Sequence, residues 1–197
     1  QSRPHIAIQA TCSHLADAAG EITTLLHRGV SLISTAEEMA HPAASNPAMA
    51  NALQQQAVTH NAALLGTGIN PGFVLDLLVI ALSGVCAEIK SISATRINDL
   101  APYGHSVLAT QGVGLSPEAF AQGVADGSVV GHIGFVQSLQ MIAEALGWQL
   151  DRIEESREPI ISTVRRKTTL ITVEPGQVAG CHHRAIAYHE GRPGITL

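Results

Sequence analysis

The sequence predicts an α/β protein with a parallel sheet first and an α+β region carrying an open mixed or antiparallel sheet second. Two observations lead to this prediction. Short apolar runs alternate with amphipathic helical segments over the first half of the chain, as in βαβ units. From residue 150 onward, strand-like runs follow one another with only short turns between them. We therefore expect two domains, at 1–87 and 88–197.

Composition supports a globular domain and argues against several classes of partner. The 197 residues are 46% hydrophobic but only 3% aromatic, a balance that suits close packing of helices on sheets. The net charge is −5 and there is no basic patch, so we expect no nucleic-acid partner. The longest apolar stretch, 72–87, contains Asp76 and is too short for a bilayer, so we expect no membrane partner. Three scattered cysteines are typical of a reduced, cytoplasmic protein.

A strand–helix–strand unit opens the chain. We expect strands at 4–11 and 30–34 and a helix at 17–27, with Gly29 ending the helix. This order implies a parallel strand pair joined by a right-handed crossover.

The second of these strands leads into two adjacent carboxylates, Glu37 and Glu38. In open α/β sheets, ligands bind beyond the carboxyl ends of the strands, where the small residues Ser34, Thr35 and Ala36 leave room. A carboxylate at that place can transfer protons. The alternative is that both acids simply begin a helix, where the helix macrodipole favours negative charge.

A Gly-rich turn, 67–72, follows the next predicted strand. We expect a loop at 41–47, a helix at 48–61, a strand at 63–66 and a long apolar helix at 73–86. A strand, Gly-rich turn and helix in this order can bring backbone N–H groups to an anion or a cofactor ring. A tight turn with Pro71 at the first helical position explains the same residues without a ligand.

The second predicted domain begins with an antiparallel strand at 88–98 that has one solvent-facing side. A long loop at 101–114 and two helices follow, the second opening at Gly131-His132-Ile133-Gly134. The remaining predicted elements are strands, at 150–164, 168–173, 178–188 and 192–197.

Few residues of this region form a chemical constellation. Cys181-His182-His183 has no second cluster at ligand spacing, and neighbours on a strand point to opposite faces, so we predict no metal site. His132, between two glycines at a helix start, is a candidate substrate contact; a capping or packing histidine is the alternative.

Cys12 lacks an activating partner, and no Gly-x-Ser-x-Gly elbow is present, so nucleophilic hydrolysis is poorly supported.

Several of these segments together resemble a known family. They are Ile8-Gln9-Ala10-Thr11, Ser34-Thr35-Ala36-Glu37-Glu38, Gly66-Thr67-Gly68-Ile69-Asn70-Pro71-Gly72-Phe73, Gly131-His132-Ile133-Gly134-Phe135 and Val173-Glu174-Pro175-Gly176-Gln177. In these segments the chain resembles the 2,4-diaminopentanoate dehydrogenases and native amine dehydrogenases, which belong to the dihydrodipicolinate-reductase-like NAD(P)-dependent oxidoreductases. The resemblance extends over nearly the whole chain.

The resemblance implies a partial Rossmann-type first domain and a second domain that builds a substrate pocket and a homodimer contact. It implies reversible oxidative deamination of an amine or diamino acid, or reductive amination of a ketone with ammonia, using NAD(P). Glu38 would be the catalytic carboxylate, since it matches the catalytic lysine of related homoserine dehydrogenases, with Glu37 as second choice and His132 as a substrate contact. The implied cofactor residues are Ala10, Thr11, Ser34, Thr35, Asn70, Pro71 and Gly72.

The chain departs from the family in one respect. The Gly-rich phosphate loop is absent together with its strand and helix, so we expect a chain that is incomplete at its N-terminus and short at its C-terminus. One alternative is therefore a non-catalytic fragment or split-enzyme half that only associates with another subunit. Another is a homoserine-dehydrogenase-like or dihydrodipicolinate-reductase-like enzyme, although position 38 then lacks the lysine.

Overall fold

The computed structural model describes residues 4–197 and divides into two compact units. Unit 1 comprises the described part of Gln1–Thr95 with Ile133–Ile153 and Ala187–Leu197; unit 2 comprises Arg96–His132 and Glu154–Ile186. The domain boundary expected after residue 87 stays a prediction. Within the described residues, no helix combines the length and the apolar character that a bilayer crossing requires.

Helices and strands alternate through the first half of the chain and strands dominate its end. The helices are α1 (Leu15–Leu26), η1 (a 3₁₀ turn, Glu37–Ala40), α2 (Pro42–Ser45), α3 (Pro47–Thr59), α4 (Leu77–Ser83), α5 (His105–Thr110), α6 (Pro117–Asp126) and α7 (Phe135–Leu146). The strands are β1 (Ile6–Gln9), β2 (Ser31–Ser34), β3 (Leu64–Gly66), β4 (Ile92–Ser93), β5 (Arg152–Ile161), β6 (Arg166–Lys167), β7 (Thr172–Val173), β8 (Val178–His189) and β9 (Arg192–Thr196).

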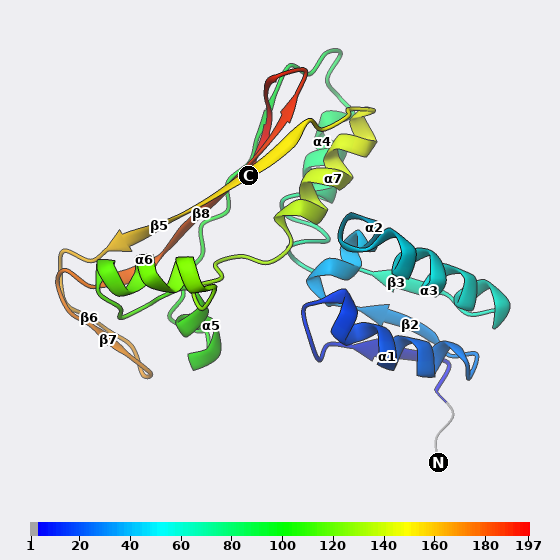
Figure 1. The fold of residues 1–197 in the computed structure, drawn as a ribbon, viewed down its shortest axis with the longest axis horizontal. Helices are drawn as coiled ribbons and strands as arrows, with labels where there is room; N and C mark the ends of the chain where they lie inside the picture. The colour runs from blue at the N-terminus through cyan, green and yellow to red at the C-terminus, as the bar shows by residue number, and fades with distance from the viewer. Residues whose placement is uncertain (1–3) are drawn as a thin grey trace. The chain divides into compact units, whose positions relative to one another are not determined.

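The first sheet of unit 1 confirms the predicted βαβ arrangement and the α/β fold class. Its order is β1-β2-β3, and all neighbours are parallel, with Ile8 opposite Ile33 and Ile33 opposite Leu65. Helices α1 and α3 contact each other and cover one face of this sheet (Figure 1). The core between these layers is apolar and comprises Leu15, Ala18, Ile22, Leu26, Leu32, Ala36, Met39, Leu53 and Ala57.

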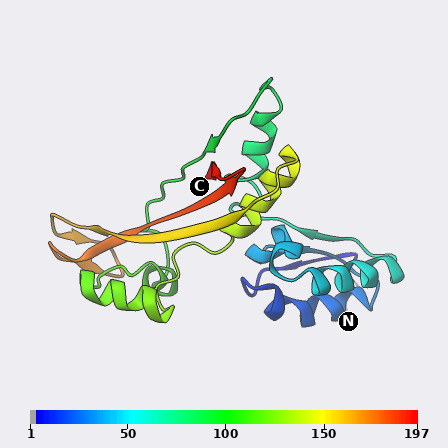
Figure 2. The ribbon, with the colours of Figure 1, turned by 45° about the horizontal axis from the view of Figure 1, so that its top comes forward.

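The second sheet has the order β4-β9-β8-β5 and is mixed, as the sequence predicted (Figure 2). Strands β8 and β9 are joined by Glu190 and Gly191, both at positive φ, which is the geometry of a tight hairpin turn. The predicted antiparallel strand at 88–98 was wrong. Only Ile92–Ser93 pairs, and it runs parallel to β9. Ile97 is 92% exposed, so the imperfect apolar alternation there does not reflect one buried face.

Three further segments differ from the prediction for local reasons. The loops expected at 41–47 and 101–114 contain the short helices α2 and α5. The helix expected at 73–86 begins only at Leu77. Asp76 accounts for this late start, because its carboxylate accepts the Leu77 N–H and caps the helix there.

We predict that Gly66→Ala destabilises the first sheet. A Cβ on Gly66 would lie 1.6 Å from the Met39 carbonyl oxygen, so η1 would have to move away from β3. We expect a loss of about 3 kcal/mol or more in the free energy of unfolding, measured by urea titration.

Gly20→Ala is the matched control for this experiment. Gly20 lies in α1 and a Cβ there meets nothing within 4 Å, so the substitution should gain up to about 1 kcal/mol. Equal effects of the two substitutions would contradict the steric argument.

Candidate functional site

The tips of the three parallel strands lie next to one another. The ladder continues past each strand end, since Thr35 N–H donates to Gln9 O and Thr67 N–H donates to Ser34 O, both at 3.0 Å. Residues that follow β1, β2 and β3 in the sequence therefore gather at one edge of the sheet. This is the edge at which open α/β sheets bind ligands.

Ser34 and Thr35 differ in their surroundings, although the resemblance gives both to the cofactor. Ser34 is fully buried; its Oγ donates to Gln9 Oε1 at 2.5 Å and accepts the Ala36 N–H at 3.3 Å. Its hydroxyl therefore links the end of β1 to the end of β2 inside the fold. Thr35, Ala10 and Thr11 are exposed and are available to a ligand.

The 67–72 turn folds back tightly on itself. Gly72 adopts a φ of +117°, which L side chains rarely take, and a Cβ there would lie 2.3 Å from the Gly68 nitrogen. Pro71 and Gly72 are consequently buried, whereas Asn70 is half-buried. Of the three residues predicted to pack by the nicotinamide, Asn70 is the most exposed to solvent.

Glu37 lies beside this turn. A Cβ on Gly134, the residue before α7, would be 2.5 Å from Pro71 Cδ and Cγ and 3.5 Å from Glu37 Cβ. The start of α7 therefore lies close to both the turn and the first glutamate, and the missing side chain of Gly134 leaves room for Pro71. Glu37 is half-buried, and its carboxylate forms no hydrogen bond or ion pair with any residue of the described range 4–197.

Glu38, one residue later, is occupied by a structural contact. Its Oε2 accepts the Leu15 N–H at 2.7 Å, and its Oε1 lies 3.2 Å from His14 Nδ1. Its backbone N–H donates to Ser13 O at 3.1 Å. The carboxylate thus caps the N-terminus of α1, where an unpaired N–H and the helix dipole both favour an anion. This arrangement ties η1 to α1.

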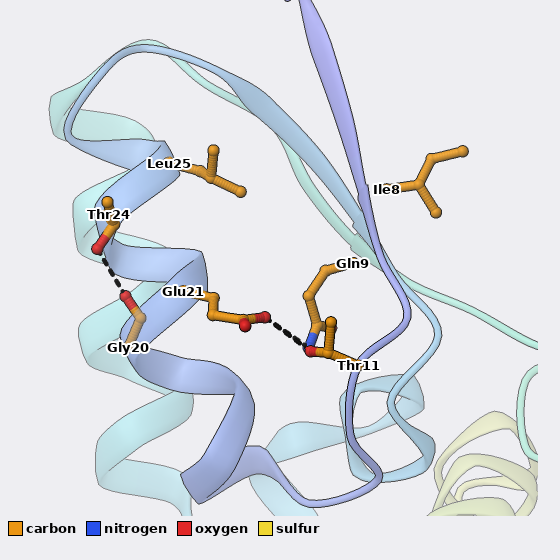
Figure 3. Close-up of a pocket in the computed structure, with 7 residues that line it drawn as sticks. All are labelled: Ile8, Gln9, Thr11, Gly20, Glu21, Thr24 and Leu25. Atoms are coloured by element: carbon orange, nitrogen blue, oxygen red, sulfur yellow. Dashed lines mark hydrogen bonds between the residues drawn. The ribbon is translucent and has the colours of Figure 1, made fainter.

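An open hollow of about 450 Å³ lies between β1 and α1 and falls within the usual range of small-molecule sites. Thr11 Oγ1 donates to Glu21 Oε2 at 2.7 Å, and both residues line the hollow, as Figure 3 shows. The hollow therefore contains one predicted cofactor residue, Thr11, but neither Glu37 nor Glu38. Its lining is formed by Ile8, Gln9, Thr11, Gly20, Glu21, Thr24 and Leu25.

His132 belongs to unit 2, where side chains hold its backbone. Its N–H donates to Nδ1 of the buried His183 at 2.9 Å, and His183 Nε2 lies 3.0 Å from Glu155 Oε2. Arg157 pairs with Glu155 at 2.9 Å and donates from Nε to Val130 O at 2.7 Å. The His132 backbone is thus fixed, and a role for its side chain in substrate binding stays a prediction.

Two residues that shape the site were not identified as such from the sequence. Asp76 belongs to no recognisable sequence motif. It is, however, the one carboxylate inside the apolar stretch 72–87, and an acid in such a stretch indicates a special role. For Gly134, the sequence indicates only a place at the start of a helix. Its contact with Pro71 depends on tertiary packing, and no local pattern could have revealed it.

The comparisons with known proteins agree with this architecture. Residues 73–197 match the model of the 2,4-diaminopentanoate dehydrogenase C-terminal domain, which covers more than half of the chain. The chain belongs to the 2,4-diaminopentanoate dehydrogenase family.

The chain is also similar to one curated protein and to one solved structure. The chain is 40% identical over 193 residues to 2,4-diaminopentanoate dehydrogenase from Acetoanaerobium sticklandii, a match that covers 98% of this chain and 55% of the relative. It also shares its fold with an amine dehydrogenase from Mycobacterium smegmatis, with a TM-score of 0.81 at 22% identity over 98% of this chain and 57% of that one. The chain spans about half the length of both.

We predict that Glu155 contributes to the stability of this dehydrogenase-family chain in a pH-dependent way. The hydrogen bond with His183 lowers the pKa of Glu155 from its ordinary value of 4.5, and the charges of His183 and Arg157 lower it further, against the opposing effect of burial. A lowered pKa in the folded state stabilises the fold above the ordinary pKa. That contribution is lost as pH falls from about 4.5 through the folded value.

Glu155→Gln should therefore cost about 1 kcal/mol at pH 7 and flatten the acid limb of the stability profile. The measurement is urea unfolding at pH 7, 4 and 3. Glu158→Gln on the same strand is the control, because that side chain is 69% exposed and its nearest partner, His182, is 3.9 Å away. A parallel acid limb in wild type and Glu155→Gln would contradict the prediction.

Proposed function

We propose that the chain is part of an NAD(P)-dependent oxidoreductase that acts on CH–NH₂ groups. It would deaminate an amine or diamino acid oxidatively, and aminate a ketone with ammonia in the reverse direction. Membership of the 2,4-diaminopentanoate dehydrogenase family supports the reaction class. The observation that carries the proposal is the half-buried Glu37, which lies beside the Gly-rich turn and has no protein partner among the described residues.

A carboxylate has two uses in this reaction. In amination, ammonium must lose a proton before it can attack a ketone carbonyl, and the carbinolamine hydroxyl must gain a proton to leave as water. One carboxylate within hydrogen-bond reach can accept the first proton and return the second. The iminium that results is cationic, so the same carboxylate stabilises it electrostatically.

The strand tips offer residues that suit a nicotinamide cofactor. Ala10, Thr11 and Thr35 are exposed at the carboxyl ends of parallel strands, and the half-buried Asn70 lies on the adjacent turn. These residues would hold the cofactor in a Rossmann-type domain. When bound, the cofactor supplies hydride for amination or accepts it in deamination.

Of the two glutamates, we assign catalysis to Glu37. The expectation from sequence was Glu38, because of its correspondence with a catalytic lysine. The Glu38 carboxylate, however, already accepts the Leu15 N–H and contacts His14. A group that must exchange protons with substrate cannot also keep this cap unchanged, whereas Glu37 has no competing partner in residues 4–197.

We predict that Glu37→Gln lowers kcat for amine-dependent NAD(P)⁺ reduction by about 10²- to 10⁴-fold, because the amide cannot exchange the required protons. Cofactor affinity, measured by fluorescence titration with NADH and NADPH, should change little. Glu38→Gln should chiefly lower stability, by about 1 kcal/mol, because the α1 cap is weakened.

The reverse pattern would return the catalytic role to Glu38: wild-type stability with lost turnover in Glu38→Gln, and retained turnover in Glu37→Gln. Absence of cofactor binding to the intact protein at millimolar NAD(P)H would instead favour a non-catalytic subunit that acts only by association. Size-exclusion chromatography of the same samples tests the homodimer, which we also propose on the strength of the family resemblance.

A further inference from the structure

We infer that Asp76 is a positioning residue that fixes the 70–72 turn for cofactor binding; this inference rests on the proposed function. Asp76 is 0% exposed, so its carboxylate is cut off from water. A carboxylate in such a place is retained only where several donors satisfy its oxygens. The identity of those donors therefore indicates what the residue is for.

Three donors from three different parts of unit 1 meet on this carboxylate. Oδ2 accepts the Gly72 N–H at 2.7 Å and the Ser138 hydroxyl at 2.8 Å. Oδ1 accepts the Leu77 N–H at 2.6 Å. The first donor lies in the Gly-rich turn, the second in α7 and the third at the start of α4, so one side chain joins all three elements.

The helix cap alone does not account for this arrangement. Capping α4 needs only the Oδ1 contact with Leu77. The Oδ2 atom instead holds Gly72, whose backbone adopts the positive φ that the turn requires. Through Ser138, the same oxygen ties the turn to α7, the helix whose preceding residue, Gly134, lies close to Pro71 and Glu37.

The consequence is a fixed spacing between the turn and the catalytic carboxylate. The shared Oδ2 atom couples Gly72 to α7, and Gly134 places α7 against Pro71 and Glu37. Small errors in the placement of reacting groups cost large factors in rate. Asp76 would thus act on the reaction without touching substrate or cofactor.

The test compares Asp76→Asn and Ser138→Ala with wild type in the intact protein. Asp76→Asn replaces one acceptor oxygen by a donor NH₂ group, which must face either the Leu77 N–H or both Gly72 and Ser138. We expect the Kd for NAD(P)H, measured by fluorescence titration, to rise about tenfold to hundredfold. Deuterium exchange of the peptide spanning 67–76, followed by mass spectrometry, should accelerate. Asp17→Asn, an exposed acid of α1, is the matched control and should change neither readout.

A merely structural role gives a different result. It would reduce the fraction of folded protein, and hence total activity, but leave the Kd of the folded fraction unchanged. An Asp76→Asn protein that folds and binds NAD(P)H within about twofold of wild type overturns the proposal. Should Asp76→Asn not fold, Ser138→Ala decides the question, because it removes only the α7 donor. We expect a rise in Kd of about threefold from Ser138→Ala, and unchanged affinity with unchanged exchange overturns the proposal.

These measurements distinguish a failure of this inference from a failure of the proposed function. A protein that binds NAD(P)H but oxidises no amine contradicts the proposed function and leaves the Asp76 measurements valid. A wild-type protein that binds no NAD(P)H contradicts both the proposed function and the role of Asp76 in cofactor binding. In that case the exchange rate at 67–76 still decides whether Asp76 orders the turn.

Discussion

Three close approaches occur near the carboxyl edge of the first sheet, and each is possible because the residue there is a glycine. At Gly66 the η1 backbone lies where a side chain would be, at Gly72 the turn folds onto residues 67–68, and at Gly134 the start of α7 meets Pro71. A Cβ at any of the three would lie within 2.5 Å of another atom. Because interiors are close-packed, such contacts leave little freedom for the segments to shift relative to one another. The placement of Glu37 beside the turn depends on all three.

Near these three glycines, the adjacent residues Glu37 and Glu38 have the same side chain but different surroundings. A 3₁₀ turn rotates successive side chains by about a third of a circle, so Glu37 and Glu38 leave it in different directions. One reaches the N-terminus of α1 and satisfies an N–H that the helix cannot pair itself. The other is left beside the turn with no protein partner among residues 4–197. Their difference is one of direction and not of residue type.

A buried or half-buried carboxylate helps to hold a loop at two places in this chain. Asp76 holds the Gly-rich turn of unit 1 through Gly72. In unit 2, Glu155 accepts from His183 and Arg157, and those two residues hold the backbone at His132 and Val130. In both places the carboxylate adds side-chain hydrogen bonds that help to fix a segment outside the regular helices and sheets.

Local sequence was sufficient for the α/β class, the parallel order of the first strands, the mixed second sheet and the family, because hydrophobic periodicity and turn residues are local signals. It also placed the candidate carboxylates and the Gly-rich turn at neighbouring strand ends. From the sequence, Glu38 was the preferred catalytic carboxylate, 88–98 was wrongly predicted as an antiparallel strand, and neither Asp76 nor Gly134 was predicted to shape the site. Tertiary structure determines the α1 cap formed by Glu38, the parallel direction of β4 and the donors around Asp76, since each depends on contacts between segments far apart in sequence: Leu15 with Glu38, β9 with β4, and Ser138 with Asp76.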